Sequence, residues 1–344
     1  MKLKSVLAFL ITVVLVAVLI HIFWPRRMER SFYSMGGIPV KVAAYGRNFI
    51  QFDRNYSAVE KKVAELVSVF NRYNKNSELS KINEKADAQP VVISSTMREL
   101  IELSFKWYNV SEKTFDPTVL PLLLLWENSA KSGELPSKGT IAFIRSYVGL
   151  GKVEFERDSI FFPVRGMKLD FGAVAKGFIV DEGVKILVDE GVDRGLIEAG
   201  GDSYAFGDGE FKFGIQDPFD KTKLLGTVQV GEGAVVTSGD YERYVEIEGK
   251  KYSHIIDPRT GMPVDTGIAS VTIIGGSAAS ADAIATAVMV LGLEDGLDFL
   301  ASKASDRSFV LVHGDKKNMK VYCSKDLRGK FTPSNASIRI TERN

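Results

Sequence analysis

The sequence predicts an α+β fold, because strand-like segments come in runs that are mixed with isolated helices. Apolar residues recur at helical spacing from Tyr56 to Phe70, with charged residues on the opposite side. Residues 36–44 instead show the alternation of a strand, and 192–230 has the alternation and the turns of a β-meander. No long linker separates two units, so the 344 residues are expected to form two interleaved parts.

The same patterns place the remaining elements. A polar segment (71–83) follows the first helix, and 131–139 is expected to be an exposed loop because Gly, Ser, Pro and Lys dominate it. Further helices are expected at about 94–112, 173–190, 280–291 and 294–303. Further strands are expected at 153–162, 167–171, 234–238, 243–247, 251–256, 268–274, 308–313 and 319–323.

Charge and cysteine content exclude several classes of protein. Lys and Arg total 44 against 43 Asp and Glu, and the basic excess lies in the first 30 residues, so the rest of the chain is slightly acidic. A nucleic-acid-binding domain is usually strongly basic, and this class is therefore disfavoured. Cys323 is the only cysteine, which rules out an internal disulfide and the CxxC patterns of zinc and thioredoxin-type sites.

Residues 5–24 are apolar and contain no charged side chain apart from the titratable His21. As a helix they would span roughly 30 Å, the thickness of the hydrocarbon core of a bilayer. The stretch is longer than a signal-peptide core and lacks a small-residue cleavage site, and no cysteine follows it for lipid attachment. We therefore expect residues 1–30 to be an uncleaved membrane anchor and 31–344 to be the folded domain; the alternative is a buried core helix.

The helix expected over 280–291 carries Asp282 and Thr286, which are four residues apart and share one face. Their neighbours are small or apolar, and a carboxylate buried among them needs a partner. A hard cation such as Mg²⁺ accepts carboxylate and hydroxyl oxygens. The alternative is that Asp282 caps or pairs locally while Thr286 bonds to its own helix, and the spacing alone leaves both interpretations open.

Three other segments combine glycine or histidine with polar groups. In 169–181, Lys176 lies at an expected helix start, where backbone groups can meet an anion or a metal. The glycines of 199–202 (AGGD) permit a close approach of the backbone to a ligand, and His254 suits acid–base chemistry near neutral pH. A plain helix start, a tight turn and a structural histidine are the alternatives. The Walker, Rossmann and G-x-S-x-G motifs do not occur.

Two aromatic segments place rings beside hydrogen-bonding groups. Tyr73 precedes the polar residues 77–83, and Phe115 precedes Asp116 and Thr118. This combination suits a ligand with a planar ring, although each segment alone is also compatible with core and loop.

In this order and combination, the segments resemble the ApbE family, the FAD:protein FMN transferases. The resemblance runs from Met35 to about Val312. Two positions depart from the family pattern: Leu120 replaces a common glycine and Glu198 a frequent asparagine. The matching motifs are MGG (35–37), Y-x-x-x-SEL-x-x-x-N (73–83), FDPTV-x-P (115–121), LDFGAVAKG-x-x-VD (169–181), AGGD (199–202), GIQDP (214–218), TSGDYER (237–243), YSHIIDPRTG-x-PV (252–264) and AD-x-x-x-T-x-x-x-x-LG (281–292).

The resemblance implies a T-fold-like α+β domain of mixed and antiparallel sheets on the extracytoplasmic face of the cytoplasmic membrane. It implies that FMN moves from FAD to a Thr or Ser hydroxyl of an acceptor flavoprotein through a phosphoester bond, with release of AMP. Such acceptors include subunits of membrane NADH-linked redox complexes. The implied metal is Mg²⁺, held by Asp282, Thr286 and the carbonyl of Ala173.

The resemblance also assigns the remaining site residues. His254 would take the proton of the acceptor hydroxyl, and Asp257 would shape its turn. The residues implied to line the FAD cleft are Met35, Tyr73, Glu78, Phe115, Asp116, Thr118, Lys176, Glu198, Gly200, Gly201, Asp202 and Ser238.

Two other functions stay open at the level of sequence. One is an FAD pyrophosphatase, because water competes with an acceptor hydroxyl at the same phosphorus. The other is a flavin-binding module that binds FAD without turnover.

Overall fold

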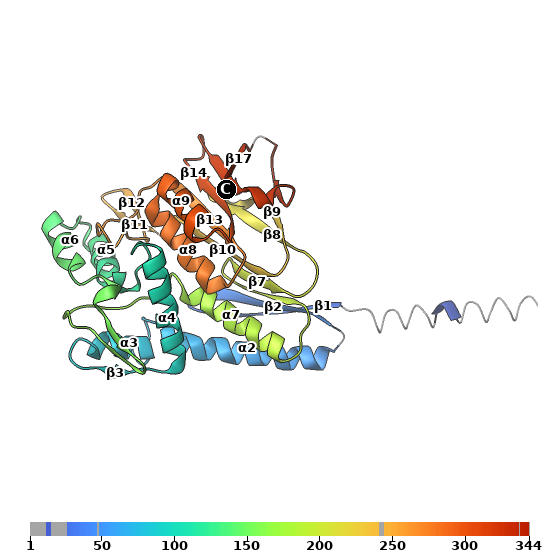
Figure 1. Ribbon diagram of the computed structural model, residues 1–344, viewed down its shortest axis with the longest axis horizontal. Coiled ribbons are helices and arrows are strands. Elements are labelled where there is room, and N and C mark those ends of the chain that lie inside the picture. Colours follow the sequence, from blue (N-terminus) through green and yellow to red (C-terminus); the bar gives the residue numbers. More distant parts are fainter. Residues whose placement is uncertain (1–11, 15–25, 47, 241–243, 337, 344) are drawn as a thin grey trace, which may run out of the picture.

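The computed structural model describes residues 12–14, 26–46, 48–240, 244–336 and 338–343. A nine-stranded sheet runs through these residues, and all neighbouring strands in it are antiparallel except the last two (Figure 1). The α+β class is confirmed. The strands lie side by side in the order β1 (Arg26–Ser34), β2 (Ile38–Gly46), β6 (Gly195–Ala199), β7 (Asp202–Phe206), β10 (Gly233–Gly239), β13 (Ile268–Ile274), β14 (Ser308–His313), β15 (Lys320–Ser324) and β17 (Ile340–Arg343).

Helices and three smaller sheets surround this sheet. The helices are α2 (Phe49–Phe70), α3 (Glu78–Lys85), α4 (Ser95–Val110), α5 (Leu120–Ser132), α6 (Lys138–Arg145), α7 (Ala175–Asp189), α8 (Ala278–Leu291) and α9 (Leu293–Lys303). The smaller sheets consist of β3 (Val91–Val92), β5 (Ser159–Phe161) and β4 (Glu154–Glu156); of β11 (Tyr244–Ile247) and β12 (Lys250–Ser253); and of β16 (Phe331–Pro333), β9 (Asp220–Val230) and β8 (Phe211–Asp217).

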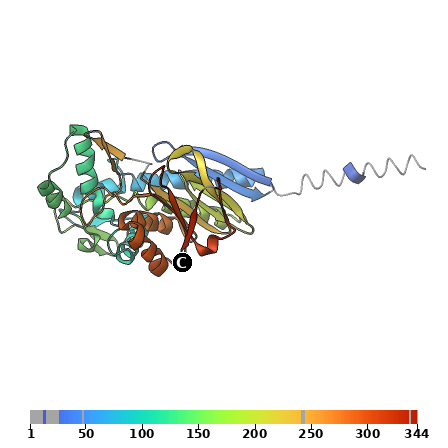
Figure 2. The ribbon, with the colours of Figure 1, turned by 90° about the horizontal axis from the view of Figure 1, so that it is seen from above.

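The large sheet is covered on both faces. Helices α2, α7 and α8 pack on one face, and the β8–β9–β16 sheet packs on the other (Figures 1 and 2). Alternate residues of β10 show the division, since Ala234 and Val236 belong to the core beneath the helices and Val235 to the opposite core. All seven residues of β13 are buried, as expected for a strand covered on both sides.

A separate lobe has its own small core. Helices α5 and α6 and the β11–β12 hairpin surround Leu122, Trp126, Ile141 and Ile247. In Figure 1 this lobe lies with α3 at one end of the molecule, and β1 begins at the other end. The two cores meet along the chain itself, because Ile255 packs into the main core and Ile256 into the core of the lobe.

Two predicted strands differ from the structure. The strand expected at 153–162 is the β4–β5 hairpin, with a turn at Arg157 and Asp158. The strand expected at 167–171 is wrong: these residues form a connecting segment, whose backbone groups bond to side chains and to the carbonyl of Pro117 rather than to another strand. Asn83 accepts from the Leu169 N–H at 2.6 Å and donates to the Leu169 carbonyl at 2.8 Å. The N–H of Asp170 donates to the carbonyl of Pro117 at 2.7 Å. The short run 167–171 therefore resembles a strand in composition, but no other strand pairs with it.

Helices and edge strands account for the elements that the sequence patterns missed. Helix α6 begins inside the loop expected over 131–139, where Ser137 caps it by accepting from the Thr140 N–H. Helix α3, α5, β1, β16 and β17 also had no prediction. The domain boundary expected at residue 30 falls inside β1, which pairs with β2 along its whole length.

The predicted anchor segment, 5–24, lies outside the described residues apart from 12–14. Across the described part of the chain, no helix combines the length and the apolar character needed to cross a bilayer.

Helices α7 and α8 approach each other closely at Gly177 on α7. A Cβ atom at this position would lie 2.3 Å from the backbone carbon of Ala278 on α8. Only glycine therefore allows these two helix backbones to pack at their observed separation.

We expect Gly177→Ala to force α7 and α8 apart and to lower the free energy of unfolding by roughly 1–3 kcal/mol. Denaturant unfolding of the full chain measures this change. Gly139→Ala on α6 is the matched control, since its added Cβ would meet nothing closer than the Ser137 hydroxyl at 3.8 Å. Equal stability of the two variants would contradict the importance of the contact.

Candidate active site

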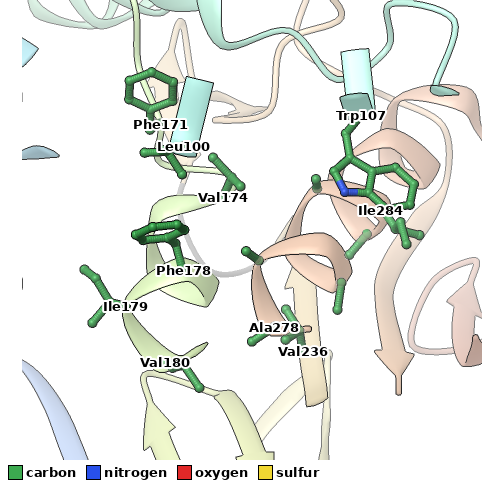
Figure 3. Close-up of a cluster of buried hydrophobic side chains, with 14 of the residues drawn as sticks. Leu100, Trp107, Phe171, Val174, Phe178, Ile179, Val180, Val236, Ala278 and Ile284 are labelled. Carbon is green, nitrogen blue, oxygen red and sulfur yellow. The ribbon is translucent and has the colours of Figure 1, made fainter. Parts of the chain in front are cut away.

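Helices α7 and α8 run in opposite directions through the main core. In Figure 3, α7 leads from Val174 to Val180, whereas α8 leads from Ala278 toward Ile284 in the opposite sense. The two helices touch at Gly177 and Ala278. Because Gly177 is in the first turn of α7 and Ala278 is the first residue of α8, the segment that leads into α7 approaches the first half of α8, which carries Asp282.

Asp282 and Thr286 lie on one face of α8, as predicted. Asp282 is only 3% exposed and Thr286 is half-buried. Together with the backbone carbonyl of Ala173 they would offer a carboxylate, a hydroxyl and a carbonyl oxygen, a donor set that suits Mg²⁺. Among the described residues no three His, Cys, Asp or Glu side chains converge as a metal site. A cation here would thus depend on one carboxylate and neutral oxygens.

Asp181 holds the first turn of α8. Its two carboxylate oxygens accept from the N–H groups of Ala278 and Ala279 at 2.7 and 2.9 Å. Burial raises the pKa of Asp181 to about 6, although the two amide donors act in the opposite direction. A side chain of α7 therefore fixes the helix that carries Asp282, in addition to the close contact at Gly177.

Lys176 in the first turn of α7 pairs with Asp202 at the start of β7. The distance from Lys176 Nζ to Asp202 Oδ2 is 2.7 Å, and Asp202 is fully buried. Burial raises the pKa of Asp202, while the Lys176 ammonium and the Thr237 N–H lower it. Because an unpaired buried carboxylate is costly, this ion pair fixes the start of α7 against the sheet.

The glycine turn before Asp202 lies at the same end of the sheet. Gly200 and Gly201 have φ of +58° and +94°, and they connect β6 to β7 in a two-residue hairpin. A Cβ on Gly200 would lie 2.8 Å from a methyl carbon of Ile38, so the start of β2 is adjacent. Met35 is half-buried in the β1–β2 turn that precedes Ile38.

Two predicted residues flank this end of the sheet. Glu198 on β6 pairs with Lys41 on β2 at 3.2 Å, and its side chain is 40% exposed. Ser238 on β10 is half-buried and stands opposite Val271 of β13. The structure thus gathers Lys176, Asp202 and the glycine turn, with Glu198 and Ser238 on neighbouring strands.

The segment Phe115–Thr118 is folded around a buried carboxylate. Asp116 accepts from the Thr118 N–H and hydroxyl at 2.8 and 2.6 Å and from the Leu150 N–H at 3.2 Å. Burial raises the pKa of Asp116 to about 6, and these hydrogen bonds lower it in part. Phe115 is 2% exposed within the main core. The hydrogen bonds of this segment connect the FDPT turn to the turn at Gly149.

Arg72, which the sequence did not single out, joins three segments beside this turn. Its guanidinium contacts Glu127 on α5 at 2.6 Å and Asp170 at 2.9 Å. It thereby connects the end of α2, the lobe and the segment that leads into α7. No local pattern could have revealed this role, because Glu127 lies 55 residues away in sequence.

His254 follows β12 at the border between the lobe and the main core. It is half-buried, and the turn after it is held by Asp257. The Asp257 carboxylate binds the Arg259 guanidinium at 3.0 Å, and the Gly261 N–H donates to the Asp257 carbonyl at 2.7 Å. Trp126 donates to the Gly261 carbonyl at 2.9 Å, which fastens the turn to α5.

A family model, described as the ApbE family, matches residues 36–310 of this chain. This chain belongs to the ApbE family. An FAD:protein FMN transferase of Klebsiella pneumoniae (strain 342) is 31% identical over 313 residues, which cover 89% of this chain and 95% of that protein.

Solved structures agree with this assignment. An ApbE protein from Thermotoga maritima has a TM-score of 0.80 at 26% identity, with 89% of this chain and 99% of that chain covered. The flavin transferase ApbE from Vibrio cholerae has the same fold, with a TM-score of 0.76 at 24% identity and the same coverage. The resemblance drawn from the motifs is confirmed.

Two residues of the ApbE motifs lie away from the helix pair. Tyr73 is 73% exposed beyond the end of α2, with the Arg72 guanidinium 4.3 Å from its ring centre. Glu78 accepts from the Ser94 N–H and hydroxyl at 2.7 Å each, and so joins the start of α3 to the start of α4. In the structure, both carboxylate oxygens of Glu78 are thus engaged within the protein.

We expect Asp181→Asn to change stability in a pH-dependent way. The folded carboxyl has a pKa of about 6 against an ordinary value of 3.8, so between these values the folded state holds the proton more tightly than the unfolded state. The stability of the unmodified protein relative to the variant should fall as pH rises from about 4 to 6, and then level off.

Thermal unfolding of both proteins across this pH range measures the difference. Asp116 is present in both proteins, so its own titration cancels. Asp298→Asn on the exposed side of α9 is the control and should follow the unmodified protein at every pH. A constant difference between Asp181→Asn and the unmodified protein would show that Asp181 does not titrate in this range.

Proposed function

We propose that this chain transfers FMN from FAD to a Thr or Ser hydroxyl of an acceptor flavoprotein, the activity for which its relatives are named. One observation carries the proposal. The start of α7, where Lys176 lies, packs at Gly177 against the first turn of α8, the helix that carries Asp282 and Thr286. Basic and oxygen-donating groups are thus combined as a pyrophosphate substrate requires.

Asp282, Thr286 and the Ala173 carbonyl are the groups that would hold Mg²⁺. When bound, the cation supplies positive charge to the pyrophosphate oxygens on which negative charge grows during attack at phosphorus. Asp282 contributes the negative charge of the site, and its burial in a helix of alanines restricts its side chain to few positions. Lys176, held by Asp202, places an ammonium group at the start of α7.

The acceptor hydroxyl forms a new P–O bond to the phosphorus on the FMN side, and the bond from this phosphorus to the bridging oxygen breaks. AMP leaves with the bridging oxygen. The hydroxyl proton needs a base, and His254 supports this role because a neutral imidazole accepts protons near pH 7. The turn that Asp257 and Trp126 hold in place fixes the backbone next to His254.

We propose that the chain is anchored in the cytoplasmic membrane with its folded domain on the outer face. The apolar stretch 5–24, whose length matches a bilayer-spanning helix, supports the anchor. The resemblance to the ApbE family implies the outer face. The acceptors would then be flavoproteins of the same membrane, such as subunits of NADH-linked redox complexes.

We expect Asp282→Asn to lower FMN transfer at least about 100-fold at a fixed Mg²⁺ concentration, since the neutral amide removes the charge that would hold the cation. The assay contains the full chain, FAD, Mg²⁺ and a flavoprotein domain that a known relative labels. Flavin fluorescence on the denatured acceptor band measures transfer. Asp298→Asn is the control, and transfer by Asp282→Asn at the unmodified rate would contradict the metal assignment.

We expect His254→Ala to lower transfer roughly 10²–10⁴-fold while FAD binding is retained. The same assay, with AMP measured in parallel, separates the three functions. Transfer that depends on His254 supports the transferase, whereas AMP and free FMN released over a dark acceptor would identify a pyrophosphatase. FAD binding without any AMP would identify a flavin-binding module.

A further inference from the structure

The end of the molecule where β1 begins brings three segments together. Arg26 pairs with Gly46, so the first residue of β1 lies beside the last residue of β2. Helix α2 starts only three residues later, at Phe49. Figure 1 shows the starts of β1 and α2 at the same end of the molecule, remote from the lobe. We call the surface formed by 26–30, 46 and 48–54 the N-terminal end face.

Two large apolar side chains are exposed on this face. Phe49 and Ile50, the first two residues of α2, are 61% and 70% exposed. The other apolar residues of the same helix that face the core, such as Val59, Val63 and Leu66, are at most 1% exposed. Single exposed apolar residues are ordinary on protein surfaces, whereas an adjacent aromatic and aliphatic pair forms a small apolar patch that an apolar partner can cover.

The same face carries an excess of positive charge. Arg26, Arg27 and Arg30 lie on β1 and Arg54 is exposed on α2. Three acidic groups lie against this face: Glu29 contacts Arg27, Asp53 contacts Arg30 at 3.2 Å, and Glu190 accepts from the Gln51 side chain at 3.5 Å. Arginines around an aromatic and an aliphatic side chain are suited to anionic lipid headgroups and the interface beneath them.

The short sequence distance between the apolar stretch and β1 also indicates that the partner of this face is a lipid bilayer. The stretch 5–24 is followed by Pro25 alone before β1 begins at Arg26. One extended residue spans about 3.5 Å, so no flexible linker separates the sheet from the predicted anchor. If residues 5–24 cross the bilayer, the N-terminal end face must lie against its surface.

We propose that the N-terminal end face is a membrane-docking surface, with Phe49 and Ile50 in the lipid interface and the surrounding arginines at anionic headgroups. This inference rests on the proposed membrane location of the chain and goes beyond it, because it fixes the orientation of the folded domain. Helix α2 has 22 residues and is therefore about 33 Å long. Its far end, at Phe70, adjoins Arg72 and the segment that leads into α7.

The orientation has a consequence for the substrate. In Figure 1, α2 extends from the N-terminal end face toward the lobe along the long axis of the molecule. A domain that docks through this face holds the candidate active site roughly 30 Å from the bilayer surface. The acceptor hydroxyl must then be presented at a comparable height above the membrane rather than at its surface.

A fluorescent label on α2 tests the docking surface. The full chain carrying Cys323→Ser, with Ile50→Cys as its single cysteine, is labelled with NBD and reconstituted into vesicles of phosphatidylcholine and phosphatidylglycerol (3:1). We expect nitroxide-labelled lipids to quench the label, and its emission to shift to shorter wavelength. Ser68→Cys is the matched control, since it is exposed on the same helix about 27 Å farther along; its label should show neither change.

Two further measurements separate the possible failures. Flotation of the labelled protein with the vesicles reports the anchor, and FMN transfer in the same vesicles reports the enzyme activity. A protein that floats and transfers FMN but whose label at position 50 is quenched no more than the label at position 68 overturns the docking surface alone. Quenching at position 50 that weakens in vesicles of phosphatidylcholine only supports the role of the arginines. A protein that does not float overturns both the anchor and the docking surface.

Discussion

The candidate site depends on how closely α7 and α8 pack. Gly177 lets the two backbones touch, and Asp181 from the next turn of α7 binds the free N–H groups at the start of α8. The alanines of α8 also let this helix pack closely on the sheet, because small side chains leave little space between helix and sheet. A larger separation would move α8, and Asp282 with it, away from the start of α7.

Side chains from elsewhere in the chain help to hold the segment that leads into α7. Asn83 binds both backbone groups of Leu169, and Arg72 binds Asp170. A segment without ladder hydrogen bonds can present its carbonyl groups to a ligand, whereas a strand must use them for its neighbours. The irregular backbone at this point is therefore a feature that suits a binding site.

The sequence predicted the central elements well, because their patterns are local. The small and apolar residues of 280–291 predicted a helix, which the structure shows as α8, and the apolar run 268–274 predicted the strand β13. Family motifs added the assignment that residue patterns alone left open. The supporting contacts could not be predicted in this way, since Asp181 and its partner Ala278 are 97 residues apart and Trp107 and its partner Ser280 are 173 apart. Such pairs become visible only when the fold brings them together.

The order of the strands in the sheet determines how much of the chain must be synthesised before the sheet can form. The segments of β1 and β2 are synthesised first, but β2 also pairs with β6, and Lys41 and Glu198 on these strands are 157 residues apart. Until β6 exists, the buried residues Val40, Val42 and Ala43 have no sheet neighbour on that side. Long-range pairing of this kind makes folding slow and cooperative. If the chain crosses the membrane during synthesis, the β1–β2 hairpin lies beside the bilayer without its neighbour β6 until about 150 further residues have been synthesised.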